Sequence, residues 1–371
     1  MQALKRVLLK LLLLIIAMAA LEVLARVALA YVLPPDYAKV RAALAGKSRY
    51  QPGYQKTTEQ AYLLYVPTPN MPVDGRIDHN SQGYRGKAVP MDHTSDIYRI
   101  LCLGGSTTYG WTVRHAESTY PAQLELLMNE HPPAGYRAVE VINGGAPYAT
   151  SAEMLAYYHF KFHYYKPDLV ILNEGGNDAE AMMEPNYQPD YSNWRQAPVP
   201  IRPLPPFGRR LVKSRLISLL LLPVLYGQNP GEPAFIRDAN VPPAAVWYPR
   251  TTTARARLTM PRIPLQEYAF AHNMQALILA IQRDGAKVLL MPFRESPAGY
   301  SPAEVECIEF NRKLMEEYAS RYGAGFAPFP VEAISPQNWV DSCHLNASGE
   351  IEKARYILPF VQELIARRGN E

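Results

Sequence analysis

The chain has few cysteines and little net charge. Among 371 residues there are 3 cysteines, and 38 Lys and Arg residues against 34 Asp and Glu residues give a formal net charge of +4. This small excess gives no reason to expect a nucleic-acid partner, which proteins bind through many basic contacts to phosphate. The 8 histidines are scattered and show no metal-ligand spacing. We therefore expect no nucleic acid, no metal and no cofactor, while the sequence leaves protein partners unknown.

The three cysteines leave the question of a disulfide open. Cys102 lies in an apolar run and is expected to be buried. Cys307 and Cys343 could form a disulfide in an oxidising compartment, where such bonds persist. The spacing of two cysteines does not show whether they pair, so both states stay open.

Apolar residues and prolines are abundant by contrast. Hydrophobic residues make up 48% of the chain, so a sizeable core is possible in one large domain or two small ones. Many of the 34 prolines lie between residues 184 and 264. Proline interrupts helices and strands, so this stretch is expected to be an irregular insertion on a compact scaffold.

A long apolar run lies near the N-terminus. It begins after Lys10 and continues through Leu33, which is long enough for a helix that spans a bilayer. Glu22 and Arg26 interrupt it, but residues four apart share one helix face and can pair. We therefore expect a single-pass transmembrane anchor over residues 7–33.

The charges before this run indicate its orientation. Lys5, Arg6 and Lys10 precede it, and basic residues favour the cytoplasmic side of a membrane. The anchor would then lie in the cell inner membrane, with the rest of the chain in the periplasm or outside the cell. The alternative is a signal peptide that is cleaved near residues 28–30.

The rest of the chain divides into two parts. Residues 34–96 are polar and turn-rich and are expected to form an extended segment before the main domain. Residues 97–368 then alternate between strand and helix patterns, with an insertion at about 184–264. Short apolar runs predict buried strands at residues 98–103, 138–142, 168–173 and 287–291. Amphipathic patterns predict helices at residues 120–130, 152–162, 266–283, 303–322 and 349–368.

This alternation of strands and helices indicates the fold class. Strands with continuous apolar runs are typical of a parallel sheet that helices cover on both faces. We expect an α/β protein with a three-layer α/β/α, flavodoxin-like parallel sheet, an N-terminal transmembrane helix and a Pro-rich insertion. In such sheets, ligands bind at the carboxyl ends of the strands. The polar motifs described next all follow a predicted strand or lie in a loop that can reach that edge.

Ser106 follows the first predicted strand. Gly104 and Gly105 precede it and allow a tight turn between the strand and a helix-like segment. A serine at such a turn is exposed near backbone N–H groups that stabilise an anion. Two interpretations stay open at this point: a nucleophile, or a loop that holds a phosphate, as in flavin-binding proteins of the flavodoxin type.

Asp341 and His344 favour the nucleophile. A serine hydroxyl is a weak nucleophile and needs a base to take its proton. An imidazole is such a base near neutral pH, and it works best when a carboxylate orients it. The separation of three residues places Asp341 and His344 on one turn, where both can point at one site. A surface loop with an unrelated Asp and His is the alternative.

Asn177 lies in a third polar motif, Gly175-Gly176-Asn177-Asp178, shortly after the strand predicted at residues 168–173. Its side-chain amide is a neutral donor that suits the anion of a tetrahedral intermediate. The alternative is a turn that only closes the strand.

Together, these motifs resemble the blocks of the SGNH (GDSL-type) hydrolase family. Ser106 matches the nucleophile of block I, although Gly105 stands where the GDSL name has Asp, as in a Gly-Gly-Ser-Thr-Thr branch of membrane-anchored bacterial members. Asn177 matches the oxyanion donor of block III. Asp341 and His344 match the Asp-x-x-His of block V, as orienter and base.

Block II departs from the family pattern. Residues 143–151 align with it, but Tyr148 stands where the glycine of the oxyanion hole is expected. The backbone N–H of Tyr148 could still donate beside the N–H of Ser106, while the tyrosine side chain would narrow the pocket or change the backbone path. Residues 80–86 also resemble a segment found upstream of block I in membrane-anchored members.

The resemblance implies a serine esterase. Ser106 would attack an ester, His344 would move the proton, and water would hydrolyse the acyl-enzyme. The implied substrates are acylated envelope glycans, lipids or small esters. Three alternatives stay open: an O-acyltransferase that acylates a polysaccharide with the same residues, a catalytically idle scaffold subunit of a membrane assembly, and a flavin- or phosphate-binding module. In the idle scaffold, His344 would lie far beyond hydrogen-bond reach of Ser106.

One segment of the insertion has its own pattern. Basic residues between positions 209 and 215 precede an apolar stretch at 216–226. We expect this segment to pack on its own domain as a lid. The alternative is a basic amphipathic helix that rests on the membrane.

Overall fold

The chain forms two compact units in the computed structural model, which describes residues 2–32, 41–42, 45, 57–60, 62–73, 75–183, 187–191, 206–226, 260–296 and 300–367. The smaller unit comprises Met1–Tyr54 and Gln196–Tyr248, and the larger unit comprises Gln55–Arg195 and Pro249–Glu371. Most of the predicted insertion lies outside the described residues. The segment boundaries given from the sequence stay predictions.

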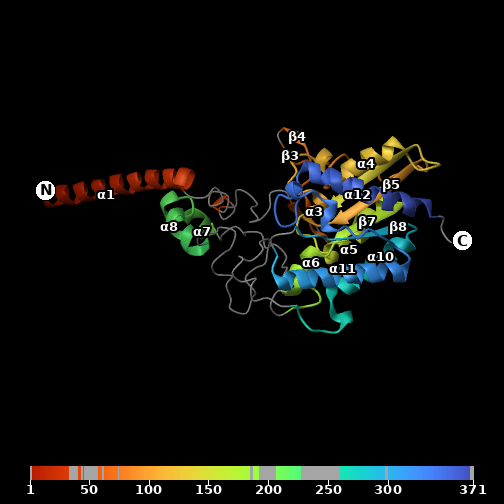
Figure 1. Cartoon of the computed structure of the whole chain (residues 1–371). Coiled ribbons are helices and arrows are strands. Elements are labelled where there is room, and N and C mark those ends of the chain that lie inside the picture. The colour runs from red at the N-terminus through yellow and green to blue at the C-terminus, as the bar shows by residue number, and fades with distance from the viewer. Residues whose placement is uncertain are drawn as a thin grey trace. The chain divides into compact units, whose positions relative to one another are not determined.

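The smaller unit contains one long apolar helix, α1 (Gln2–Val27), which continues as a π-helical turn over Ala28–Val32 (Figure 1). Residues Lys5–Val32 have a mean hydropathy of 2.6, and among the described residues this is the one helix that is long and apolar enough to cross a membrane. A secretory signal sequence is also apolar and N-terminal. The predicted apolar helix is therefore present, and its place in a membrane stays a proposal.

A second helix of this unit, α8 (Arg215–Tyr226), begins against Glu22 of α1. The Glu22 carboxylate accepts hydrogen bonds from the first two backbone N–H groups of α8, at 2.6 and 3.0 Å, and from Ser214 Oγ at 2.8 Å. The first N–H groups of a helix have no partner within it, so Glu22 caps α8. Arg26, the predicted partner of Glu22, lies 3.9 Å from it.

This contact bears on the basic segment of the insertion. Arg209 and Arg210 lie in α7 (Pro206–Leu211), and the basic segment leads directly into the helix that α1 holds. The segment therefore belongs with the N-terminal helix. The lid and the membrane-surface helix both stay predictions.

The larger unit is built on a five-stranded parallel sheet with the order β6-β5-β7-β8-β9. This is the 2-1-3-4-5 order of flavodoxin-like sheets, which confirms the predicted fold class. All four predicted strands are present, and the fifth was not predicted because it is only two residues long. The strands are β5 (Ile97–Gly104), β6 (Ala138–Gly145), β7 (Leu169–Glu174), β8 (Lys287–Pro292) and β9 (Gly325–Phe326).

Helices cover both faces of this sheet (Figure 1). The strand interiors require this, because residues 100–103 of β5 are fully buried while their side chains alternate between the two faces. On one face lie α4 (Tyr120–Glu130) and α12 (Ala347–Ala366). On the other lie α5 (Ser151–Phe160), α10 (Ala269–Arg283) and α11 (Pro302–Tyr322).

Element boundaries differ from the prediction by up to three residues. Strand β6 runs to Gly145, three residues further than expected. Helix α5 ends at Phe160 because Lys161 leaves the helical conformation (φ −138°, ψ −62°), and a 3₁₀ turn follows. Helix α10 starts at Ala269, because the residues before it form another 3₁₀ turn. Each 3₁₀ turn shares the spacing of apolar residues that predicted the helix.

The polar segment before the sheet contains two short hairpins. Strands β1 (Thr57–Gln60) and β2 (Leu64–Pro67) pair antiparallel, as do β3 (Pro72–Val73) and β4 (Arg76–Ile77). The described part of the segment thus holds local strand pairs.

Candidate active site

The carboxyl edge of the sheet brings the predicted site residues together. Strand β5 pairs in register with β6 and with β7 up to its last residue, so the loops that follow these strands meet. Ser106 begins the short helix α3 (Ser106–Tyr109) after β5, and Asn177 is the second residue of α6 (Gly176–Met183) after β7. Tyr148 lies in the loop after β6.

Asp341, His344 and Ser106 form a continuous chain of hydrogen bonds. Nε2 of His344 lies 2.8 Å from Oγ of Ser106. Nδ1 of His344 lies 2.8 Å from Oδ2 of Asp341 and 3.0 Å from Oδ1. A carboxylate only accepts, so we assign the imidazole proton to Nδ1 and leave Nε2 to accept from the serine hydroxyl. Two segments 238 positions apart in the sequence thus meet at one site.

A short closed loop holds Asp341 and His344 in place. Trp339 and Leu345 form an antiparallel bridge at its base, and Val340 N donates to the carbonyl of His344 at 2.8 Å. Within the loop, Asp341 Oδ1 accepts from two backbone N–H groups at 2.8 and 2.9 Å. Aspartate commonly closes turns in this way. The predicted turn is therefore present, and it fixes the carboxylate beside the imidazole.

The two side chains shift each other's pKa. Partial burial would raise the pKa of Asp341, but the hydrogen bonds that it accepts from His344 and from the loop lower it well below its usual range. Burial would lower the pKa of His344, but its hydrogen bond to Asp341, with Cys343 beside the ring, raises it above the ordinary value. The pair therefore favours a carboxylate beside a strongly basic imidazole.

Asn177 faces the same site from the start of α6. Its Nδ2 donates to the carbonyl of Ala149 at 2.8 Å, which uses one of the two N–H groups of the amide. The amide carries a second N–H group, and Asn177 lines the cavity beside Ser106. Asn177 thus lies at a helix start beside Ser106 and is not part of a simple closing turn.

Tyr148 has a left-handed backbone conformation, with φ of 60°. This conformation favours glycine, and it costs a residue with a side chain roughly 1–2 kcal/mol. The position therefore has a conformation suited to the glycine that the family pattern expects. Tyr148 lines the cavity beside Ser106.

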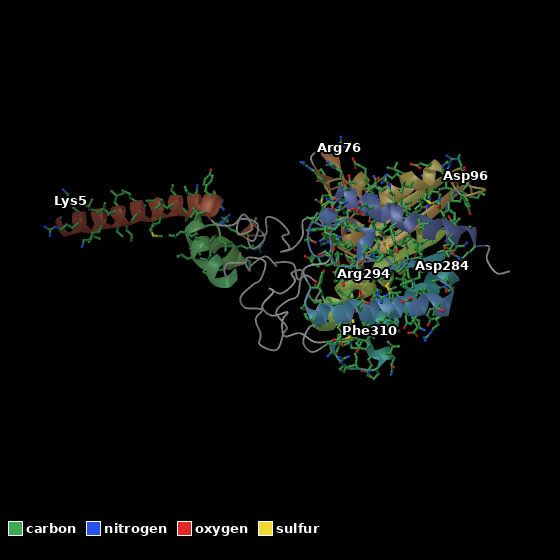
Figure 2. The ribbon with its side chains drawn as sticks, in the orientation of Figure 1. Lys5, Arg76, Asp96, Asp284, Arg294 and Phe310 are labelled. Atoms are coloured by element: carbon green, nitrogen blue, oxygen red, sulfur yellow. The ribbon has the colours of Figure 1, made fainter. Side chains whose placement is uncertain are left out.

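A cavity of about 200 Å³ opens at this edge. Ser106, Asn177 and His344 all line it, so these three residues face one space. Much of the remaining wall is aromatic, formed by Trp111, Tyr148, Phe293 and Tyr300. Arg294, which Figure 2 labels, lies two residues after β8. It forms an ion pair with Glu309 at 3.2 Å.

Arg85 supports the turn that carries Ser106, a role that we did not predict. Its buried guanidinium forms an ion pair with Asp78 at 2.7 Å. It also donates to three carbonyls between residues 109 and 113, directly after the helix that carries Ser106. The resemblance of residues 80–86 marks the segment, but nothing in the sequence reveals the partners of Arg85.

Lys353 and Asn173 also support the turn that carries Ser106. Lys353 is fully buried, and its Nζ donates to the carbonyl of Thr107 at 3.1 Å and to Asn173 Oδ1 at 2.7 Å. Burial lowers the pKa of Lys353 to about 8, and Glu350 opposes this. A buried lysine in a helix that reads as amphipathic gives no signal of this role in the sequence.

The cysteines form no disulfide. Cys102, Cys307 and Cys343 are all free, which settles the state that the sequence left open. Cys343 Sγ lies 3.5 Å from His344 Nδ1, and the ligand atoms of Asp341, Cys343 and His344 lie within 4.8 Å of one another. This spacing would fit around a metal ion, but both ring nitrogens of His344 already have hydrogen-bond partners.

The chain belongs to the GDSL-like Lipase/Acylhydrolase family, whose profile matches residues 102–350. The resemblance that the motifs predicted is thereby confirmed. Family and fold together define an SGNH-type ester hydrolase.

The comparison with solved structures gave matches at low sequence identity. TesA is 16% identical, with a TM-score of 0.42 over 72% of this chain and 99% of its own. Axe2, an acetylxylan esterase from Geobacillus stearothermophilus, is 13% identical, with a TM-score of 0.41 over 73% and 97%. LAE5, an alpha/beta hydrolase enzyme from the metagenome of Lake Arreo, Spain, is 14% identical, with a TM-score of 0.42 over 72% and 96%. The sequence matched no curated protein.

Proposed function

We propose that the chain is a membrane-anchored, extracytoplasmic serine esterase. Ser106 is the nucleophile, His344 is the general base and Asp341 orients the imidazole. The side chain of Asn177 and the backbone N–H groups of Ser106 and Tyr148 form the oxyanion hole. The hydrogen-bonded chain from Asp341 through His344 to Ser106, at the wall of a cavity, carries this proposal.

The reaction follows from this geometry. As Ser106 Oγ attacks the ester carbonyl, Nε2 of His344 takes the hydroxyl proton. Asp341 stabilises the imidazolium that forms, and the oxyanion accepts from the N–H donors beside it. His344 then gives its proton to the leaving alcohol, which breaks the ester bond and leaves the acyl group on Ser106. Water attacks the acyl-enzyme with the same base and returns the serine.

The cavity supports a substrate with a short acyl chain. Its volume is about 200 Å³, and aromatic side chains, including Tyr148, close part of it. Acylated envelope glycans and small esters offer such an acyl group, whereas lipids with long acyl chains fit this cavity less well. The extracytoplasmic location rests on the apolar helix α1 and on the basic residues that precede it.

The alternatives differ from the esterase in one of two ways. In the O-acyltransferase another acceptor attacks the acyl-enzyme, and in the scaffold and the phosphate-binding module no acyl-enzyme forms. An O-acyltransferase would use the same residues with a sugar hydroxyl in place of water. The idle scaffold is disfavoured by the 2.8 Å distance between His344 and Ser106. The same hydrogen bond disfavours a phosphate-binding turn, in which the Ser106 hydroxyl would face the phosphate.

A product assay tests the proposal and separates it from the transferase. The full-length protein in detergent is given p-nitrophenyl acetate, with and without a soluble oligosaccharide. We expect nitrophenol and free acetate in both cases, and no release above buffer from a His344→Ala variant. An acetylated oligosaccharide as the main product would favour the transferase, and no nitrophenol at all would contradict both.

Replacing Asn177 by alanine is expected to lower kcat roughly 10²- to 10³-fold with little change in KM, since one oxyanion donor is lost. Asn129→Ala is the matched control, because Asn129 donates to Val139 on the surface of α4, away from the cavity. Steady-state kinetics of the two variants measure the difference. Equal kcat values in the Asn177→Ala and Asn129→Ala variants would show that Asn177 does not stabilise the oxyanion.

Replacing Tyr148 by glycine is expected to shift the preference toward longer acyl chains. The change widens the cavity and places glycine in a conformation that it adopts readily. The ratio of kcat/KM for butyrate over acetate esters should rise at least about tenfold, as expected when one or more methylenes gain space. An unchanged ratio would show that Tyr148 does not limit the acyl pocket.

A further inference from the structure

Glu174 ends strand β7 with its side chain buried between the nucleophile turn and the start of α6. Its exposed fraction is 2%. Oε1 accepts from the backbone N–H groups of Gly175 and Asn177, at 3.0 and 3.1 Å. One carboxyl oxygen therefore fixes the backbone of the residue whose side chain is the proposed oxyanion donor.

The second carboxyl oxygen faces the residue before the nucleophile. A Cβ on Gly105 would lie 2.9 Å from Glu174 Oε2 and would also collide with Nδ2 of Asn177. The carboxyl group and the Asn177 amide thus pack against the same side of Gly105. Only a glycine leaves room for both, which explains why this chain lacks a side chain where the GDSL name has Asp.

Charged groups surround Glu174 on several elements. Asp178 of α6 and Glu153 of α5 add negative charge, while Lys353 of α12 adds positive charge. His344 faces the same cavity from its loop. Burial raises the pKa of Glu174 well above its ordinary value, and Asp178 raises it further. Burial among these groups therefore favours the neutral acid, and Oε1 accepts the two N–H groups.

We propose that Glu174 is a positioning residue, which holds the start of α6 so that the Asn177 amide lies against Gly105 and faces the oxyanion. This inference rests on the proposed esterase function. Glu174 acts through Asn177 and takes no proton in the reaction. Its ionisation would place a negative charge beside the developing oxyanion, so it should slow the chemical step and leave substrate binding little changed.

Two variants separate positioning from simple structural support. Glu174→Gln keeps the accepting oxygen and stays neutral at every pH. Glu174→Ala removes the accepting oxygen together with the ionisable group. Glu352→Ala is the control, because that carboxylate also accepts from a backbone N–H and a hydroxyl, both of Ser335. Glu352 does not line the cavity.

The experiment measures kcat and KM for p-nitrophenyl acetate from neutral to alkaline pH, with the full-length chain in detergent. We expect Glu174→Ala to lose about 10²-fold in kcat with KM nearly unchanged, the size of a lost oxyanion contact. Glu174→Gln should keep the wild-type kcat at neutral pH and lack the alkaline decline of the wild type. Glu352→Ala should keep the wild-type profile.

Either of two results overturns the inference. One is a wild-type kcat in Glu174→Ala, and the other is the same alkaline decline in Glu174→Gln as in the wild type. If Glu174→Ala does not fold, the pH profile of Glu174→Gln alone decides. A wild-type chain without turnover would overturn the esterase proposal as well, whereas an active wild type with indifferent Glu174 variants would overturn this inference alone.

Discussion

Replacing Ser106 by alanine is expected to lower kcat for ester hydrolysis on the order of 10⁶-fold, as in other serine hydrolases that lose the nucleophile. The variant lacks the Oγ that lies 2.8 Å from His344 Nε2, so no acyl-enzyme can form. Any remaining rate would come from the oxyanion hole and substrate binding alone. Steady-state turnover of p-nitrophenyl acetate by the full-length chain measures the loss.

Ser342 provides the matched control for this change. It lines the same cavity, two residues before His344, so Ser342→Ala removes another hydroxyl from the site. We expect its kcat to stay close to the wild-type value. A large loss of kcat in Ser342→Ala, together with an active Ser106→Ala variant, would identify Ser342 as the nucleophile and contradict the assignment.

Replacing Asp341 by asparagine is expected to lower kcat about 10⁴-fold, because the amide no longer fixes the imidazole in the reactive tautomer. It should also move the acid limb of the pH–rate profile. In the wild type, the hydrogen bond to Asp341 raises the pKa of His344, so the neutral base is lost as pH falls through that raised value. Without the carboxylate the pKa returns toward its ordinary value of 6.5, and the limb moves to lower pH.

The pH profile distinguishes this role from a structural one. The Asp341 side chain is 46% exposed and closes a local turn, so its loss could also loosen the loop. A loosened loop would lower kcat without moving the limb in a fixed direction. A limb that stays in place or moves to higher pH in Asp341→Asn would contradict the proposed coupling of Asp341 and His344.

The strands and the motif residues could be predicted because both depend on local sequence. A short apolar run such as residues 100–103 predicts a strand that is buried on both faces, and these residues are fully buried. Parallel strands then present their carboxyl ends at one edge, so the residues after β5 and β7 must meet. The separation of Asp341 and His344 alone predicts that both lie on one turn, and two hydrogen bonds join them within that turn.

The supporting residues could not be predicted because their partners are distant in the sequence. Arg85 binds carbonyls about 25 positions away, and Lys353 binds Thr107 across 246 positions. Periodicity reports which face of an element is buried, but not what a buried charge meets there. The positive φ of Tyr148 could not be predicted either, because tyrosine rarely adopts this conformation. A glycine at this position would have indicated it.

Covalent labelling of the nucleophile tests the central claim most directly. A fluorophosphonate probe transfers its phosphonyl group to an activated serine Oγ and releases fluoride. We expect the full-length wild type to take up one probe, to carry it on the peptide that contains Ser106, and to label far more slowly in a His344→Ala variant. No uptake by the wild type, or a label on Ser342 in place of Ser106, would contradict the account.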